Sequence, residues 1–345
     1  MLGMTPSTPS SPFLSRRGFL RSGMLTGTAG LVVGAASLGP WSRLVQAQPA
    51  VADAPTGLAA APLFYPFTIG EHRAVVINDG NLRLEPIIPT VVANASSEQE
   101  VVDLLEANFL PLTHVSAPQN TLLVEYPEGW VLFDTGSGGL FGPNTGRQLA
   151  AIRAAGIDPA SITHVLITHF HPDHLGGVLT ADGTRNFPNA ELVVSGQEAS
   201  FWLSEENRTE ATSGLFDLAA RMVGQSGMHV RRVKPDEEIL PGLYAQATPG
   251  HTPGHMSYLV ESAGHQLLVL GDVANHSVLF LERPDWHFSF DFDPALASTT
   301  RRRTLEMAAT DRLRVLGYHF PFPGLGHIRT ATPTSFRYIA EPWEA

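Results

Sequence analysis

Apolar and polar residues alternate along several short stretches of the chain, and turn residues separate these stretches. An alternation with a period of two is typical of half-buried β-strands. A first series of such stretches consists of 73–80, 121–126, 130–133, 164–167 and 192–194. A second series consists of 230–233, 244–247, 256–260 and 266–270. We expect an Asp79-Gly80 turn after the first stretch and a hairpin over 121–133.

Apolar residues spaced by three or four positions predict helices between and after these strands. Val101, Leu104 and Leu105 share one face of a helix that we expect over 96–108. Further helices are expected over 146–155, most of 197–222 and 294–310. This order of elements predicts an α+β fold, an αββα four-layer sandwich in which two sheets pack face to face between helices.

One motif, His169-x-His171-x-Asp173-His174, follows directly after a predicted strand. Three imidazoles and a carboxylate this close together are hard to explain by packing, because burying them without partners costs several kcal/mol. A divalent metal ion removes that cost, since neutral imidazole and carboxylate are its natural ligands. Pro172 disfavours helix at His171. The first two histidines can therefore face one ion, while Asp173 and His174 face another.

Three more residues of ligand type lie where predicted strands end. His251 stands in a Pro-Gly turn, Asp272 follows an apolar strand, and His319 precedes a loop rich in Pro and Gly. Functional sites usually lie at such boundaries between strand and loop. His327 is the alternative to His319 for the last of these positions.

In type and order, these residues resemble the metallo-β-lactamase superfamily. The resemblance covers about 64–335 and includes Asp134, at a family position that orients the motif loop rather than binding metal. The segments 140–143, 284–286 and 318–327, together with the His-Pro-Asp-His form of the motif, are similar to methyl-parathion-hydrolase-like enzymes. Those enzymes are exported dinuclear hydrolases related to the acyl-homoserine lactonases.

The resemblance implies two divalent ions, each with three ligands, and one carboxylate that bridges them. The implied ligands are His169, His171 and His251 for one ion, Asp173, His174 and His319 for the other, and Asp272 as the bridge. Asp173 and Asp272 are the expected catalytic residues. Zinc is the expected metal, and manganese, iron or cobalt suit the same imidazole and carboxylate ligands.

The chemistry expected of such a centre is hydrolysis. Two ions that share a water lower its pKa, so that hydroxide is available at neutral pH to attack a carbonyl carbon or a phosphorus. Lactones, aryl esters and organophosphate triesters are the expected substrates. Two alternatives with the same fold stay open, a thioesterase similar to glyoxalase II and a non-hydrolytic iron sulfur-dioxygenase. An incomplete second metal site would favour the dioxygenase.

Several residues near the motifs are candidates for a substrate pocket, although each aromatic one can equally be an ordinary core residue. These candidates are Phe141, Phe201, Trp202, Phe216, His276 and Phe280. His255 is expected to hold the turn around His251 through a hydrogen bond. His164 is expected to be structural.

The composition limits the partners of this chain. Its 345 residues include 33 acidic and 22 basic ones, which give a net charge of −11. This charge argues against nucleic acids and anionic membrane surfaces, because both are bound through Lys and Arg. The chain has no cysteine, which excludes disulfides, thiolate ligands and a cysteine nucleophile. We expect a small, apolar, uncharged substrate, and a homodimer is one open expectation.

The first 47 residues resemble an export signal. Residues 15–20 are similar to a twin-arginine motif, an apolar run follows over 24–38, and 45–47 supply small residues at a cleavage position. We therefore expect a periplasmic or secreted protein without a stable membrane anchor. Residues 48–63, rich in Ala and Pro, are expected to be a flexible lead-in to a hydrolase domain over 64–345.

Overall fold

The computed structural model describes residues 63–342. The expected export signal lies outside the described residues, as does the expected lead-in up to residue 62. Leu63, the last residue of that lead-in, already belongs to the first strand. Within the described part of the chain, no helix combines the length and the apolar character needed to cross a bilayer.

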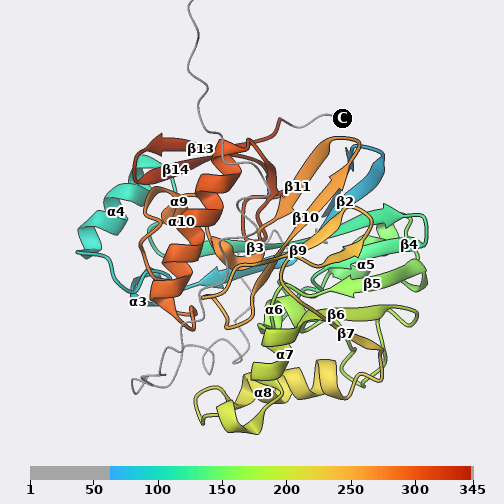
Figure 1. Cartoon of the computed structure of the whole chain (residues 1–345). Helices are drawn as coiled ribbons and strands as arrows, with labels where there is room; N and C mark the ends of the chain where they lie inside the picture. The colour runs from blue at the N-terminus through green and yellow to red at the C-terminus, as the bar shows by residue number, and fades with distance from the viewer. Residues whose placement is uncertain (1–62, 343–345) are drawn as a thin grey trace, which may run out of the picture. The chain divides into compact units, whose positions relative to one another are not determined.

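Two seven-stranded sheets form the centre of the structure (Figure 1). In spatial order, the first sheet contains β1 (Leu63–Ile69), β2 (His72–Leu84), β3 (Val115–Tyr126), β4 (Gly129–Phe133), β5 (Ile162–Leu166), β6 (Glu191–Ser195) and β7 (Val230–Val233). The second contains β14 (Ser335–Ala340), β13 (Leu325–Thr332), β12 (Arg314–Leu316), β11 (His265–Val269), β10 (Met256–Ser262), β9 (Leu243–Ala247) and β8 (Glu238–Leu240).

Helices, most of them short, form the connections between the strands. They are α3 (Ile87–Thr90), α4 (Glu98–Ala107), α5 (Gln148–Ala154), η1 (Pro159–Ser161), α6 (Pro172–Leu175), α7 (Gly196–Trp202), η2 (Glu205–Asn207), α8 (Ser213–Ala219), η3 (Ala220–Gly224), η4 (Gly271–Val273), α9 (Leu279–Glu282) and α10 (Pro294–Thr310). α10 has the predicted bounds, because Asp293 caps its first turn by accepting the N–H of Leu296 and Pro294 suits the first helical position.

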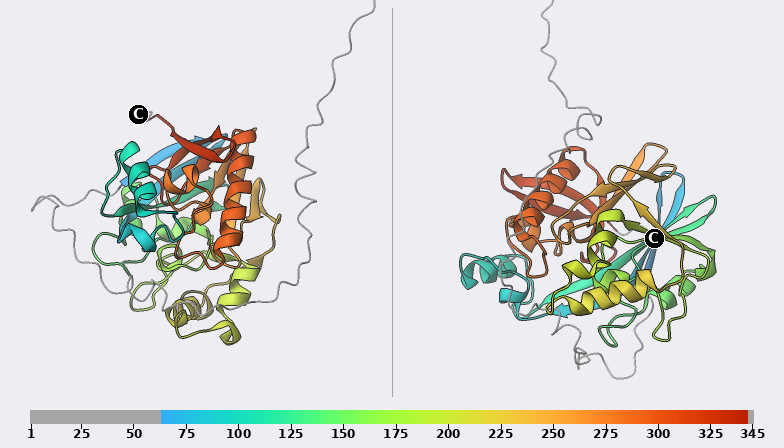
Figure 2. Two further views of the ribbon diagram at one scale, coloured as in Figure 1. Left: turned by 90° about the vertical axis from the view of Figure 1, so that its left-hand side faces the viewer. Right: turned by 60° about the horizontal axis from the view of Figure 1, so that its bottom comes forward.

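The pairing of the strands decides where the helices go. In the first sheet, β4 to β7 pair in parallel, and in the second only β11 and β12 do so. Parallel neighbours need crossover connections, which place helices on a face of the sheet. The helices α5 to α8 therefore cover the first sheet, and α9 and α10 cover the second (Figures 1 and 2).

Three apolar cores separate four layers, as predicted for an αββα sandwich. The central core lies between the two sheets and includes Leu122 of β3 and Tyr258 of β10. One outer core packs the first sheet against α7 and α8, and the other packs the second sheet against α9 and α10. Alternation along a strand explains this arrangement, since Leu122 and Val124 face the central core while Leu123 faces an outer one.

The predicted Asp79-Gly80 turn is wrong. β2 continues to Leu84, and its pairing with β3 is irregular between Asn78 and Asn81. The reason is that Asp79 is fully buried and binds a loop instead of making a turn. Its carboxylate accepts four hydrogen bonds, from the N–H and the hydroxyl of Ser137 and from the N–H groups of Gly146 and Gln148.

Candidate metal centre

The candidate centre is built where strands of both sheets end. β5 leads into His169, β9 into His251, β11 into Asp272 and β12 into His319. Ladder hydrogen bonds fix each strand, so the residues that follow it are held in place. All seven predicted ligands meet here and are at most 5% exposed: His169, His171, Asp173, His174, His251, Asp272 and His319.

The motif loop runs from β5 into the first turn of α6. His171 has extended backbone angles, φ −69° and ψ 152°, and Pro172 is the first helical residue. This change from extended to helical backbone confirms the expected effect of Pro172. It divides the motif into an extended part and a helical part. The rings of His169 and His171 meet edge to face with centroids 4.6 Å apart, whereas Asp173 and His174 come from the helical turn.

Asp134 fixes the motif loop through hydrogen bonds to two of its residues. One of its carboxylate oxygens accepts the N–H of Thr168 at 2.8 Å, and the other lies 2.8 Å from Nδ1 of His174. Asp134 is 1% exposed and has a φ of 60°, an uncommon backbone angle for a non-glycine residue. With Nδ1 engaged in this way, Nε2 is the nitrogen of His174 that faces the centre.

His251 is oriented by a carboxylate that sequence analysis missed. Nδ1 of His251 lies 2.9 Å from Oδ1 of Asp291, whose other oxygen lies 3.4 Å from the guanidinium of Arg301. Arg301 is fully buried and also donates to the carbonyls of Val273, Pro284 and Trp286. Forty positions separate Asp291 from His251, and no local motif marks the pair.

Asp272 is held at the middle of the centre by two neighbours. Its N–H donates to Nε2 of His255 at 2.9 Å, and the side-chain amide of Asn275 donates to its Oδ2 at 2.8 Å. Nδ1 of His255 lies 2.8 Å from the hydroxyl of Thr248. Both nitrogens of His255 are thus engaged, so this residue links Asp272 to the turn around His251 and is not available as a ligand.

The last histidine closes the centre opposite the motif. Nδ1 of His319 lies 2.9 Å from the carbonyl of Pro118, and its Nε2 lies 3.3 Å from Asp173 and 3.4 Å from Asp272. Tyr318 stacks on the ring of His174 with a centroid distance of 3.8 Å and donates its hydroxyl to the carbonyl of Asp173 at 2.5 Å.

The donor atoms fit divalent metal ions. Within the part of the chain that the structure describes, four buried atoms of this cluster have no hydrogen-bond partner: Nε2 of His169, His174 and His251, and Oδ1 of Asp272. Leaving such atoms unpaired is costly. The ligand atoms gather within 4.8 Å of one another in three groups: His169, His171 and His251; His169, His174 and Asp272; Asp173, His174 and His319.

Burial and neighbouring charges together set the protonation states of the ligand histidines in the metal-free cluster. Burial lowers the pKa values of His169 and His171 well below 6.5. Burial acts the same way on His251 and His319, but Asp272, together with Asp291 or Asp173, outweighs it and raises their pKa values to about 9 and about 10. The pKa of His174 is likewise raised well above 6.5, because Asp272, Asp173 and Asp134 outweigh its burial. Three of the ligands therefore carry protons that a bound ion would displace.

Most residues of the predicted aromatic wall lie in the apolar cores. Four of its candidates are at most 2% exposed and belong to the outer cores: Phe141, Trp202, Phe216 and Phe280. Trp202 packs edge to face against Phe216, and Phe280 does so against Phe288, as in an ordinary core. Phe201 is half-buried and packs edge to face against Phe292, which is 44% exposed, at 4.9 Å between centroids.

Three further histidines from the sequence analysis, His276, His327 and His164, are not among the seven candidate ligands. His276 is buried, and its Nδ1 accepts the N–H groups of Val278 and Leu279. Burial, together with the charge of His319, lowers its pKa to about 4, so His276 is neutral. His327 is half-exposed beside Glu341, outside the centre, and His164 lies 3.9 Å from Glu191.

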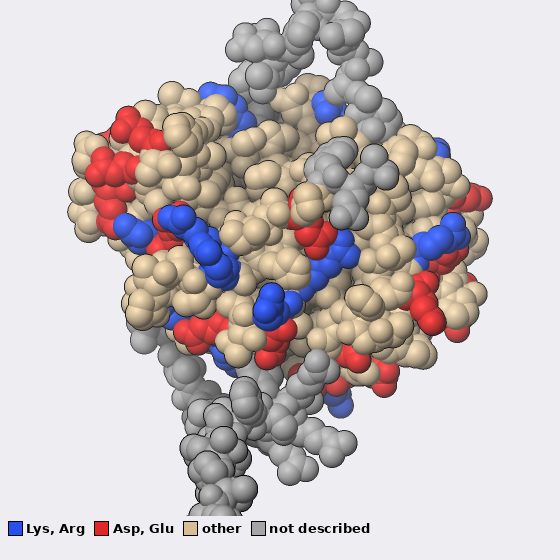
Figure 3. Space-filling view, turned by 90° about the horizontal axis from the view of Figure 1, so that it is seen from above, with Lys and Arg blue, Asp and Glu red and all other residues tan. Residues whose placement is uncertain are grey.

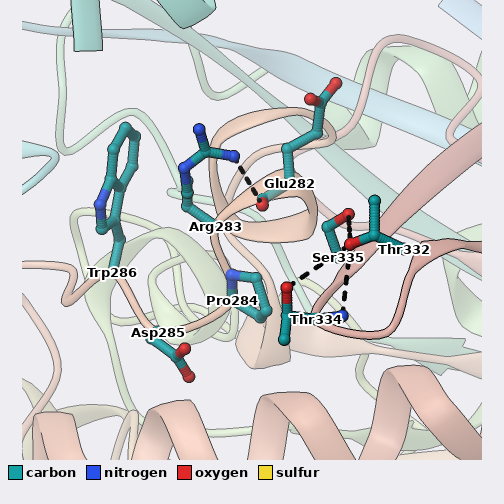
Figure 4. Close-up of a pocket in the computed structure, with 8 residues that line it drawn as sticks. All are labelled: Glu282, Arg283, Pro284, Asp285, Trp286, Thr332, Thr334 and Ser335. Carbon is teal, nitrogen blue, oxygen red and sulfur yellow. Dashed lines mark hydrogen bonds between the residues drawn. The ribbon is translucent and has the colours of Figure 1, made fainter. Parts of the chain in front are cut away.

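Figure 4 shows a pocket that is lined by other residues. It has a volume of about 300 Å³ and is lined by Glu282, Arg283, Pro284, Asp285, Trp286, Thr332, Thr334 and Ser335. The hydroxyls of Thr332 and Ser335 hydrogen-bond each other, and none of the lining residues is a candidate ligand.

On the described face seen in Figure 3, basic and acidic side chains are interspersed on a mostly uncharged surface.

Comparisons with known proteins agree with this geometry. An N-acyl homoserine lactonase of a Bacillus species is 25% identical over 204 residues, which are 54% of this chain and 75% of that protein. A probable metallo-hydrolase of Mycobacterium tuberculosis is 28% identical over 185 residues, and the match spans 46% of this chain and only 57% of that protein.

Two solved structures are similar over most of the described residues. AidC, a dizinc quorum-quenching lactonase in complex with the product N-hexanoyl-L-homoserine, has a TM-score of 0.76 and 26% identity, covering 82% of this chain and 99% of that one. The hydrolase AbOPH has the same TM-score and identity, covering 83% and 100%. A model of the metallo-β-lactamase superfamily matches residues 116–319. With that match, the two-sheet sandwich and the ligand cluster at its strand ends, the chain belongs to the metallo-β-lactamase superfamily.

Proposed function

We propose that this protein is a dinuclear metal-dependent hydrolase that opens lactones, with N-acyl homoserine lactones as the first substrate class to test. One observation carries the proposal. Buried ligand atoms from both sheets, several of them without a hydrogen-bond partner, converge around Asp272. The substrate class is supported by the similarity to lactonases, including one with a homoserine product in its structure.

Two ligand sets divide the cluster, and we assign one ion to each. His169, His171 and His251 would hold the first ion, and Asp173, His174 and His319 would hold the second. Asp272 lies between the sets, with Oδ1 at 3.2 Å from Nε2 of His174 and Oδ2 at 3.2 Å from Nε2 of His251. Zinc is the first choice, since imidazole and carboxylate ligands suit it and AidC is dizinc.

When bound, the two ions would supply an activated water and a Lewis acid for the carbonyl oxygen. The chain's own contribution is position and proton handling. Asp272 faces both ligand sets and keeps them at a fixed separation. Asp173 has Oδ2 at 3.3 Å from His319, which places a carboxylate inside the centre, where it would orient the nucleophile and accept its proton.

Aryl esters and organophosphate triesters are proposed as secondary substrates, because the same centre activates water against any polarised ester or phosphoryl group. The sulfur-dioxygenase alternative expects an incomplete second site. Here the set of Asp173, His174 and His319 is complete, which favours hydrolysis.

A substrate panel on one preparation tests the proposal. Zinc-loaded protein would be assayed with N-hexanoyl homoserine lactone, phenyl acetate, paraoxon and a glutathione thioester, before and after removal of metal by a chelator. We expect the lactone to be hydrolysed fastest, loss of activity on chelation and recovery on adding zinc. Hydrolysis of the thioester alone, or of no substrate by protein with full metal content, would overturn the assignment.

Export by the twin-arginine route remains a proposal based on residues 1–47. Fusing these residues to a reporter that is active only after folded export tests it. A matched variant with Lys at both Arg16 and Arg17 should lose export, and unchanged export of that variant would exclude the route.

A further inference from the structure

Glu198 is a buried carboxylate that has no place in the chemistry described so far. It lies on α7, is 1% exposed and, among the described residues, forms no ion pair with Lys or Arg. A buried carboxylate is tolerated only when its oxygens are well hydrogen-bonded.

Four donors satisfy Glu198. Its Oε1 accepts the N–H of Phe170 at 2.9 Å and the indole N–H of Trp202 at 2.8 Å. Its Oε2 accepts the hydroxyl of Thr252 at 2.9 Å and the N–H of Gly254 at 2.7 Å. One carboxylate therefore joins two loops that are more than 80 residues apart in the chain.

Both loops carry ligands of the same proposed ion. Phe170 stands between His169 and His171, and Thr252 directly follows His251. The first loop follows a strand of the first sheet and the second loop follows a strand of the second. The fit around Glu198 is close, because a Cβ on Gly254 would lie 2.1 Å from the backbone nitrogen of Glu198.

The other ligand set has positioning contacts that do not involve Glu198. Asp134 binds His174, Pro118 binds His319, and Tyr318 contacts both His174 and the carbonyl of Asp173. Glu198 forms none of these contacts. A displacement at Glu198 therefore reaches the first ligand set directly. It reaches the second set through Asp272 and through the backbone of the motif loop, where His174 donates its N–H to the carbonyl of His171.

We propose that Glu198 is a positioning residue that holds the loop of His169 and His171 and the loop of His251 at the spacing required by the first ion. The inference rests on the two-ion centre of the proposed function and specifies one part of it. Loss of this clamp should weaken the first ion selectively and leave the second bound.

Glu198→Gln is the sharpest test. Both donors at Oε1 are N–H groups, and Gly254 presents an N–H at Oε2. The amide NH₂ of glutamine can only donate, so in either orientation it faces another donor and at least one hydrogen bond is lost. Thr252→Val removes one hydrogen bond of the clamp, and Thr252→Ser keeps it. Leu105→Ala is the control for general damage, because Leu105 is buried in an outer core on α4 and belongs to neither ligand loop.

The readout is zinc per chain after equilibration with graded concentrations of a chelator, which requires no substrate. Wild type should release its two ions at their own midpoints. In Glu198→Gln we expect one ion to be released at a chelator concentration at least about tenfold lower than in wild type, while the midpoint of the other ion stays. Thr252→Val should lower the midpoint of the same ion by a smaller factor. Thr252→Ser and Leu105→Ala should keep both midpoints.

Equal weakening of both ions in Glu198→Gln, or unchanged midpoints in both Glu198→Gln and Thr252→Val, would overturn the clamp. These results are distinct from failure of the proposed function. Wild-type protein that binds two ions but opens no lactone would contradict the substrate assignment alone, because the clamp is measured by metal retention.

Discussion

At the residue scale, most candidate ligands are held by a second residue, which sequence analysis did not always find. Asp134 was predicted from the family resemblance, and the structure places it on His174. Asp291 and Glu198 were missed, because each is a single acidic residue far along the chain from the loops it binds. Isolated carboxylates carry no spacing pattern, so only the folded chain reveals their partners.

Asp291→Asn should weaken the first metal ion. The carboxylate lies 2.9 Å from Nδ1 of His251 and beside the buried guanidinium of Arg301, and an amide balances neither charge. Removing such an orienting carboxylate typically costs ten- to a hundredfold in metal affinity, about 1.4 to 3 kcal/mol. Competition with a fluorescent zinc chelator measures the change, and an affinity equal to wild type would contradict the role of Asp291.

Tyr318→Phe should lower stability with little effect on metal content. Phenylalanine keeps the stacking on His174 but loses the hydrogen bond from the hydroxyl to the carbonyl of Asp173. We expect a loss of about 1 kcal/mol in the free energy of unfolding, measured by urea denaturation of the zinc-loaded protein. A much larger loss together with loss of zinc would show that the hydroxyl positions Asp173 for binding.

At the scale of elements, the strands that lead into the site were predictable and several others were not. The predicted strands over 164–167 and 266–270 are buried and apolar, and they correspond to β5 and β11. The sequence analysis missed β8, which has three residues, and β13, whose residues are mostly exposed. Short or exposed strands show no alternation, since their positions are fixed by pairing with a neighbour rather than by burial.

The motif helix α6 depends on close backbone packing. A Cβ on Gly177 would lie 2.0 Å from the carbonyl oxygen of Thr135, in the loop after β4. Gly177→Ala should therefore push the motif loop away from that loop and destabilise the protein by about 2 kcal/mol or more.

Gly214→Ala is the matched control for Gly177→Ala. Gly214 lies in α8, and no atom stands within 4 Å of an added Cβ. This substitution should be neutral or stabilising by up to about 1 kcal/mol, because alanine favours helix. Thermal melts of both variants measure the contrast, and equal stabilities would contradict the packing argument.

At the scale of the whole molecule, the fold class and the meeting of the ligands were predictable, because each ligand follows a strand whose end lies at one edge of a sheet. The pocket residues were not predictable, since an aromatic residue near a motif has the same pattern whether it lines a pocket or fills a core. Trp202 and Phe280 illustrate this, as both are core residues.

The stability of the metal-free protein should be greatest near pH 6.5. His251 and His319 have raised pKa values of about 9 and about 10, so their contribution is complete below 6.5 and is lost as the pH rises through those values. His255 and His276 have pKa values lowered to about 3 and about 4, so their contribution is complete above 6.5 and is lost as the pH falls. Chemical unfolding of chelator-treated protein between pH 4 and pH 10 measures the curve, and a stability that only rises toward high pH would contradict it.

The central claim is that this chain holds two ions on either side of Asp272. Anomalous diffraction from zinc-loaded crystals, recorded on both sides of the zinc absorption edge, tests it most directly. The account predicts two peaks, one among His169, His171 and His251 and one among Asp173, His174 and His319, with Asp272 in contact with both. A single peak, or zinc bound elsewhere while these side chains hold none, would contradict it.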